Sequence, residues 1–333
     1  MSEAAKKGGS AKAFLVKYSP VIILAALVVV SSIISPVFLS VQNIYNVLRQ
    51  QAPYIMVALG VLMTILTGGI DLSAGFLISV SHVFLAAAAA WWGFASGGGI
   101  VVAILLCLGV GFAFGCANGF LVAKLKLAAF IATLAVMMIA KGLSYIITGG
   151  SPIKLPLEVE GSEGSDALIA FGQSGDPVIG LPYAVWLAII VVIIFWFIMN
   201  QTMFGRMIVA SGSNKQAVHL AGVNVDKYIF SAYAISGFMA GVAGFLICAR
   251  AGVGTSTNGD GYELDAIAAC VIGGASLSGG KGGVLMTICG VMIMGLIGNI
   301  MNLLSVASYP QQIIKGLIII GAVVMNGMTQ KDE

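Results

Sequence analysis

The sequence predicts an all-α, polytopic integral membrane protein with about ten transmembrane helices. Of its 333 residues, 59% are apolar and only 9% are charged, and the mean hydropathy is +1.04. Soluble domains carry about a quarter charged residues. Apolar runs recur from Val21 to Met328, and none shows the alternation of a barrel strand. Because a helix satisfies its own backbone hydrogen bonds in lipid, these runs are expected to cross the membrane as helices.

Ten apolar segments follow one another along the chain. The first is about as long as the hydrocarbon core is thick and too long for the core of a signal peptide, so we expect a retained helix. The expected segments are residues 20–38, 52–69, 73–94, 100–123, 127–148, 182–200, 228–249, 265–280, 283–304 and 310–328. They form one transmembrane domain, 20–328, between a basic tail at 1–19 and a short tail at 329–333.

The charge distribution orients these helices. Ten spans place both termini on one side, and the positive-inside rule makes that side the cytoplasm. The cations expected there are Lys6, Lys7, Lys12, Lys17, Lys124, Lys126, Arg206, Lys215, Lys227, Lys281 and Lys331. The opposite side receives the acidic interval 151–181 and the turn that holds Asp260 and Glu263.

Two glycine-rich stretches, "LTGGIDLSAG" at 66–75 and "VIGGASLSGG" at 271–280, share the pattern G-G-x-x-L-S-[AG]-G and indicate an internal repeat. One interpretation is a pair of tight turns in which Ser73 and Ser278 cap the following helices. The other is a pair of broken helices that line a transport path, with Asp71, Ser73, Ser276 and Ser278 facing it. A carboxylate that borders lipid is a functional candidate by default. Asp71 is also suited to stabilise the amino end of the third helix.

Further polar side chains lie within or beside apolar segments. Asn118, Asn299 and Asn302 are candidates to exchange hydrogen bonds with a polar solute along the path, or else to bond neighbouring helices to one another. Lys141 and Lys315 are expected to pair or to face water, with Asp71 a conceivable partner for either. Gln50 and Gln51 precede the second segment and face either an outer vestibule or solvent at a helix end.

The longest predicted cytoplasmic loop, 201–227, contains a helix signal. Ser213 and Gln216 fit a capping box, and Gly222 suits the left-handed end of a short helix. Two turns of helix are marginal in isolation, so this helix must dock against something. It packs either on the protein's own spans or in a groove on a soluble partner.

Four separated blocks, in the same order and over nearly the whole chain, resemble the permease subunits of ribose/galactose-type monosaccharide ABC importers. They are "GGIDLSAG", "CANGFLVAKLKLAAFIATLAVMMIAKGL", "FGRMIVASGSNKQAVHLAGVNV" and "GYELDAIAACVIGGASLSGGKGG". The resemblance implies that loop 201–227 couples to an ATPase subunit, through Gly212, Ser213, Asn214, Ala217, Leu220, Ala221 and Gly222.

The resemblance also implies the partners and the location. The partners are a second copy of the chain, a cytoplasmic ABC ATPase that carries ATP and magnesium, and a periplasmic sugar-binding protein, in a bacterial inner membrane. Asp260 and Glu263, on the outer side, are candidates to meet the binding protein.

Other chemistries are not indicated. "LSGGKGG" has Ala275 and Gly282 where a nucleotide-binding loop needs Gly and Ser or Thr, so we expect no ATPase activity and no cofactor on this chain. His82 and His219 have no second ligand at metal-binding spacing, and no basic stripe suggests nucleic acid.

Two rival classes remain. A secondary transporter driven by protons or sodium ions also predicts repeats and broken helices, but it needs an ionisable coupling site within the membrane. A non-transporting assembly protein needs only glycine-rich helix interfaces. The short helix within 213–222 discriminates against both, because neither requires a docking element in the cytosol.

Overall fold

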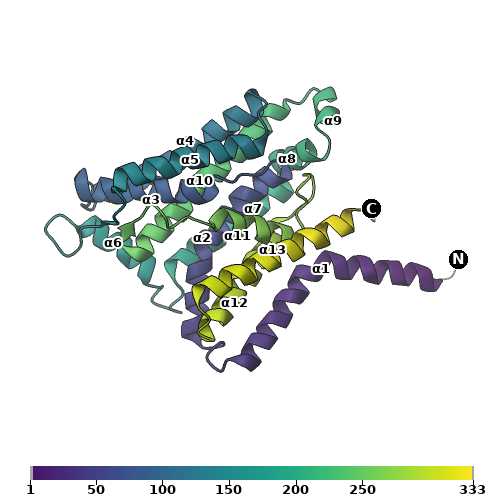
Figure 1. Cartoon of the computed structure of the whole chain (residues 1–333), viewed down its shortest axis with the longest axis horizontal. Coiled ribbons are helices and arrows are strands. Elements are labelled where there is room, and N and C mark those ends of the chain that lie inside the picture. The colour runs from purple at the N-terminus through teal and green to yellow at the C-terminus, as the bar shows by residue number, and fades with distance from the viewer. Residues whose placement is uncertain (1–2, 332–333) are drawn as a thin grey trace.

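The computed structural model describes residues 3–331, with the side chains of 18–321, 323 and 324, and it is almost entirely helical (Figure 1). The first half contains α1 (Glu3–Ile34), α2 (Val41–Leu66), α3 (Ala74–Trp91), α4 (Gly99–Gly119), the π-helix η1 (Phe120–Lys124), α5 (Ala129–Thr148), β1 (Ile153–Lys154) and α6 (Glu163–Gln173). The second half contains α7 (Tyr183–Gln201), α8 (Met203–Ser213), α9 (Lys215–Leu220), α10 (Val225–Ala251), β2 (Val253–Gly254), α11 (Tyr262–Ile272), α12 (Val284–Leu303) and α13 (Ser308–Lys331).

The all-α, polytopic membrane class is confirmed. Within residues 3–331, six helices are long and apolar enough to cross a membrane: α3, α4 with η1, α5, α7, α10 and α12. The count of ten crossings stays a prediction. The expected tails are largely helical where they are described, since α1 begins at Glu3 and α13 continues to Lys331. Residues 1–2 and 332–333 of those tails lie outside the described part of the chain.

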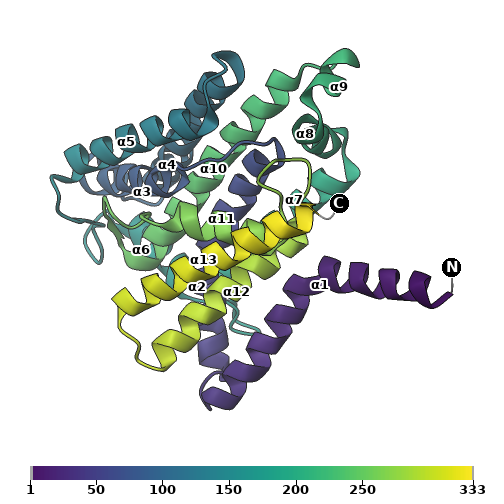
Figure 2. The same ribbon diagram turned by 45° about the vertical axis from the view of Figure 1, so that its right-hand side comes forward.

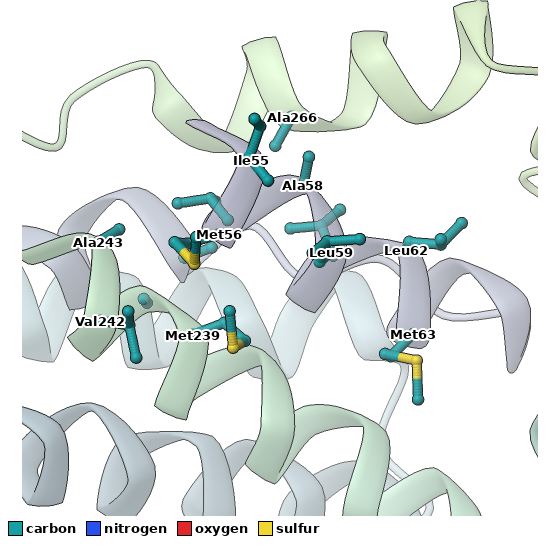
Figure 3. Packing of buried hydrophobic residues seen from close by; sticks show 14 of the residues in the cluster. Ile55, Met56, Ala58, Leu59, Leu62, Met63, Met239, Val242, Ala243 and Ala266 are labelled. Atoms are coloured by element: carbon teal, nitrogen blue, oxygen red, sulfur yellow. The ribbon is translucent and has the colours of Figure 1, made fainter. Parts of the chain in front are cut away.

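The core is built on α2 and α10, which pack against each other (Figure 3). Met56 and Leu59 of α2 lie beside Met239, Val242 and Ala243 of α10, and all five side chains are buried. Such helices are apolar on all sides because protein surrounds them in the centre of the bundle.

Small residues bring α10 against α4. Gly111 and Gly115 of α4 meet Gly237 and Gly241 of α10. On each helix the two glycines are four positions apart and so lie on the same face. A Cβ on Gly111 would overlap the carbonyl oxygen of Gly237 and lie 2.9 Å from the amide nitrogen of Gly241. These positions hold the two backbones closer than any side chain permits, as small residues commonly do between membrane helices.

The second and the eighth expected segments have other bounds in the structure. The eighth, 265–280, is helical only as far as Ile272, where the chain turns at Gly273 and Gly274 and continues without regular structure to Gly283. Gly274 has φ +83°, a conformation that ends the helix and favours glycine. The second segment begins at Val41 instead of residue 52, because the Ser40 side chain accepts a hydrogen bond from the backbone N–H of Asn43 and caps α2.

The interval 151–181 is tied to the bundle. Its strand β1 pairs with β2 in an antiparallel ladder that joins Ile153 to Gly254, and its helix α6 packs on α10. His82 of α3 supports the adjoining turn, because its Nε2 accepts the backbone N–H of Thr255 at 2.8 Å while its Nδ1 lies 2.8 Å from the carbonyl oxygen of Ile78. The two-residue strands were not predicted, since they are too short to show any periodicity.

Candidate coupling and translocation site

The two glycine stretches form turns that touch each other. The first glycine turn (residues 67–73) joins α2 to α3, and the second glycine turn (residues 273–283) joins α11 to α12. The backbone N–H of Gly280 donates a hydrogen bond to the carbonyl oxygen of Leu66 at 3.0 Å. A Cβ on Gly279 would lie 2.8 Å from the amide nitrogen of Gly68, and both glycines have positive φ, +93° and +78°. Glycine is therefore required for conformation and for proximity.

The carboxy-terminal end of α8 closes the same contact. A Cβ on Gly212 would overlap the carbonyl oxygen of Leu66 and lie 2.7 Å from the amide nitrogen of Gly280. We call the contact between Leu66, Gly68, Gly212, Gly279 and Gly280 the glycine junction. It joins both glycine turns directly to the cytoplasmic loop of the sequence prediction.

The capping roles expected for two serines are wrong. Ser73 precedes α3 but makes no side-chain hydrogen bond to its amino end, and the residue before α12 is Gly283, five positions after Ser278. The hydroxyls bond locally instead. Ser73 Oγ donates to Asp71 Oδ1 at 2.6 Å, and in the second turn the hydroxyls of Ser276 and Ser278 lie 2.7 Å apart. Equivalent positions of the two stretches thus make equivalent side-chain contacts.

Asp71 is the centre of a buried hydrogen-bonded network. It is fully buried and accepts the Ser73 backbone N–H at 3.0 Å as well as the Ser236 hydroxyl at 2.7 Å. Asn118 Nδ2 donates to Ser73 Oγ at 2.8 Å and so extends the network to α4. Three donors around a carboxylate offset the cost of removing it from water.

The prediction that Asp71 pairs with Lys141 or Lys315 is wrong. Lys315 pairs with Asp265 at 2.6 Å, whereas the Lys141 ammonium lies 4.9 Å from the centre of the Phe76 ring. The sequence did not indicate these partners, because they depend on which helices become neighbours.

The short helix predicted in loop 201–227 is α9, and its cap differs from the expected one. Ser213 is the last residue of α8, and Asn214 is the cap, since its Oδ1 accepts the backbone N–H of Ala217 at 2.9 Å. Asn214 has φ −155°, outside the helical region, which lets the chain change direction between α8 and α9. Gly222, with φ +79°, ends the motif as expected.

Helix α9 lies at the edge of the molecule, beyond α8, in both views (Figures 1 and 2). None of its residues is buried, and the Leu220 side chain is 79% exposed. Only Val218 packs on the apolar cluster at the start of α10, around Val225 and Ile229. The contact of Val218 with α10 therefore leaves the other apolar side chains of α9, Ala217 and Leu220, exposed.

A cavity of about 980 Å³ separates α9 from the bundle. The first glycine turn lines it with Thr67, Gly68 and Gly69, and its rim carries an ion pair between Lys126 and Asp226. This space therefore lies between α9 and the first glycine turn, beside the contact of Val218 with α10.

Asn299 and Asn302 bond neighbouring helices, as one of the two interpretations holds. Asn299 and Asn43 exchange amide hydrogen bonds of 2.9 and 3.1 Å between α12 and α2. Asn302 Oδ1 accepts the Gln311 amide of α13 at 2.8 Å. Both asparagines also line a second cavity, of about 150 Å³.

The two candidate contacts for a binding protein lie in different environments. Asp260 is exposed in the turn before α11, whereas Glu263 is buried against Gly75 and Gly259. Only Asp260 is available at the surface of the chain, which corrects the expectation for Glu263.

Comparison with known proteins places these features in a family. Residues 43–323 match the family described as branched-chain amino acid transport system / permease component. The ribose import permease protein RbsC of Escherichia coli K12 is 39% identical over 319 residues, 96% of either chain. RbsC of Bacillus subtilis 168 is 37% identical over 310 residues, 93% of this chain and 92% of that protein.

The galactose/methyl galactoside import permease protein MglC of Escherichia coli K12 is 36% identical over 324 residues, 93% of either chain. No solved structure matches. The match covers every helix from α2 to α12 together with both glycine turns, α8 and α9. The chain therefore belongs to this family of transport-system permease components.

Proposed function

We propose that this chain is the membrane permease subunit of an ATP-driven importer that carries a monosaccharide, a pentose such as ribose or a hexose such as galactose, across a bacterial cytoplasmic membrane. The single observation that carries the proposal is α9, a capped helix at the edge of the molecule whose Ala217 and Leu220 side chains are exposed. Membership of a permease family, and relatives named as sugar import permeases, support the same conclusion.

The proposed arrangement has ten crossings with both termini in the cytoplasm. The eighth crossing consists of α11 and the second glycine turn, and the other nine are α1, α2, α3, α4 with η1, α5, α7, α10, α12 and α13. The pairing of Asn43 with Asn299 at one end, and of Leu66 with Gly280 at the other, supports antiparallel α2 and α12. Loop 201–227 and the glycine junction then lie on the cytoplasmic side.

Two copies of the chain, two ATPase subunits and a periplasmic sugar-binding protein form the proposed importer. ATP and magnesium are held by the ATPase, in whose groove α9 docks through Ala217, Leu220 and Ala221. Asp260 is the candidate to meet the binding protein. The exposed apolar surface of Leu220 supports the docking role, because burying it on a partner is favourable.

Linkage describes how ATP drives the permease. A partner shifts the balance between inward-open and outward-open states only by as much as its affinity for the two states differs. In the proposed route, closure of the ATPase dimer moves α9, and α8 carries the movement to the glycine junction. There one backbone contact reaches α2 and α3 through the first glycine turn, and α11 and α12 through the second.

The direct test is transport by the purified proteins. The chain is reconstituted in vesicles with its candidate ATPase and binding protein, and uptake of labelled ribose, galactose, xylose and inositol is measured with and without ATP on the ATPase side. Uptake of one sugar that requires all three proteins and ATP is the expected result. Uptake driven by an ion gradient, with this chain alone, would contradict the proposal and favour a secondary transporter.

A further inference from the structure

Carboxamide side chains gather in the cavity of about 150 Å³ between α2, α11, α12 and α13. The amides that line it are Gln50, Gln51, Asn299, Asn302 and Gln311, and we call it the amide cavity. Water needs roughly 10–15 Å³ of such volume, so the space holds several water-sized groups. Five carboxamides from three helices around one space is a concentration of polar groups that membrane interiors otherwise avoid.

The charges in the amide cavity neutralise each other. Lys315 Nζ and Asp265 Oδ2 lie 2.6 Å apart, and their side chains are only 30% and 14% exposed. The remaining polar groups of the lining are neutral: the five amides and the Tyr54 hydroxyl. A ligand with a net charge would bring a third charge without a partner into this partly buried site, whereas a neutral polar ligand would not.

Gly295 of α12 makes room for the side-chain amide of Gln51. A Cβ on Gly295 would lie 2.6 Å from Gln51 Nε2, so only glycine lets the Gln51 amide lie against α12. Gln51 stands ten residues after Val41, the first residue of α2, which is about 15 Å along a helix.

An aromatic wall borders the same space. Tyr54 lines the amide cavity and stacks on Tyr262 with ring centres 4.0 Å apart and planes 4° from parallel. Carboxamides both donate and accept hydrogen bonds, as sugar hydroxyls do. An apolar face beside several amides matches a sugar ring, which has hydroxyls at its edge and C–H groups on its faces.

We infer that the amide cavity is a transient binding site for one monosaccharide on its way through the permease, with Gln51 and Gln311 donating to and accepting from its hydroxyls. This inference rests on the proposed function. It means that the permease itself binds the sugar, at a site separate from that of the binding protein. Gln311 exchanges its bond to Asn302 for a sugar hydroxyl, so that entry of the sugar loosens α13 from α12.

The test uses the complete transporter in vesicles, with Gln51→Ala and Gln311→Ala compared with Gln42→Ala. Gln42 lies on the exposed outer part of the same helix α2 and outside the amide cavity, so it is a matched control. Two rates are measured for each variant: uptake of the labelled sugar, and ATP hydrolysis stimulated by the binding protein. An excess of unlabelled leucine is added in a parallel series. The family description names branched-chain amino acids, so leucine tests whether an amino acid competes with the sugar for this site.

The expected result is a fall in uptake of about tenfold for each cavity variant, the loss expected for one hydrogen bond that matters to the passage of the sugar. Stimulated ATP hydrolysis stays near the wild-type rate, and Gln42→Ala and leucine change nothing. Wild-type uptake in both cavity variants overturns the inference alone. An equal loss of uptake and ATP hydrolysis also overturns it, since the amides would then serve the fold. A wild-type transporter that takes up no sugar overturns the proposed function and the inference with it.

Discussion

The backbone N–H of Gly280 donates a hydrogen bond to the carbonyl oxygen of Leu66 at 3.0 Å. This bond ties the second glycine turn to the end of α2, and Gly212 of α8 packs directly on it. A contact of backbone on backbone has no flexible side chain to absorb a displacement. We therefore expect a movement of α8 to be transmitted to both turns.

Replacing Gly212 by alanine should disrupt the glycine junction by pushing α8 away from Leu66 and Gly280. Its Cβ would overlap the Leu66 carbonyl oxygen, so α8 must move away, at a cost of about 1–3 kcal/mol for an overpacked site. We expect a lower melting temperature in detergent and a loss of ATP-dependent uptake. Gly109→Ala on α4, where a Cβ meets nothing within 4 Å, is the control and should keep both. A Gly212→Ala protein with normal uptake would show that close approach at the junction is not needed.

Replacing Ala217 by aspartate should abolish ATP-coupled uptake and leave the fold intact. Ala217 is exposed in the first turn of α9, where an acidic residue favours the helix. A loss of uptake then reports on docking and not on helix unfolding. Melting temperature, copurification of the ATPase and uptake are measured beside Ala217→Ser, which adds no charge and should behave like the wild type. Unchanged uptake in Ala217→Asp would refute the docking site.

The two candidate caps of α9 make opposite predictions. Asn214→Ala removes the hydrogen bond to the Ala217 N–H and should destabilise this short helix by about 1 kcal/mol. Hydrogen exchange of the amide of residue 217 should accelerate, and uptake should fall, whereas Asn214→Ser should restore much of both. Ser213→Ala should leave that amide protected, because the Ser213 side chain is not the cap. Faster exchange of this amide in Ser213→Ala, with no change in Asn214→Ala, would instead support the capping box expected from the sequence.

The Asp71 network should contribute to stability. Ser236→Ala removes one of the donors to the buried Asp71 side chain, and leaving a buried acceptor without its donor costs about 1–3 kcal/mol. The melting temperature in detergent should fall. Ser231→Ala, on the same helix, loses only an exposed bond to the Lys227 carbonyl oxygen and is the matched control. Equal melting temperatures for the two variants would mean that Asp71 does not depend on Ser236.

Several features could be predicted because they depend on local sequence. Composition was enough for the fold class, since few polar residues can be placed in lipid. The short helix within 213–222 was predicted from a capping box at Ser213 and Gln216 and from Gly222, although the neighbouring residue, Asn214, is the cap. Asn299 and Asn302 were found because amides in an apolar run need partners.

Other residues gave no local signal that reveals their role. The family resemblance named Gly212 as part of the coupling loop, but among the 44 glycines of the chain no local signal showed that it packs on Leu66 and Gly280. Gln311 and Tyr54 look like ordinary helix residues until α2, α12 and α13 are brought together. Ser236 lies in α10, whose residues are buried all round, so no apolar face indicated which neighbour its hydroxyl would meet.

The sequence by itself thus determined the membrane class, most of the long apolar helices and the position of α9, because hydropathy, caps and glycine turns act over a few residues. Only the tertiary structure decided which partners meet: Gly280 with Leu66, Lys315 with Asp265, and Glu263 with Gly75 in the interior. Helices that are apolar on every side carry little information about which of their neighbours they will touch. That choice is made when the whole bundle packs, through close backbone contacts and buried hydrogen bonds that no single segment contains.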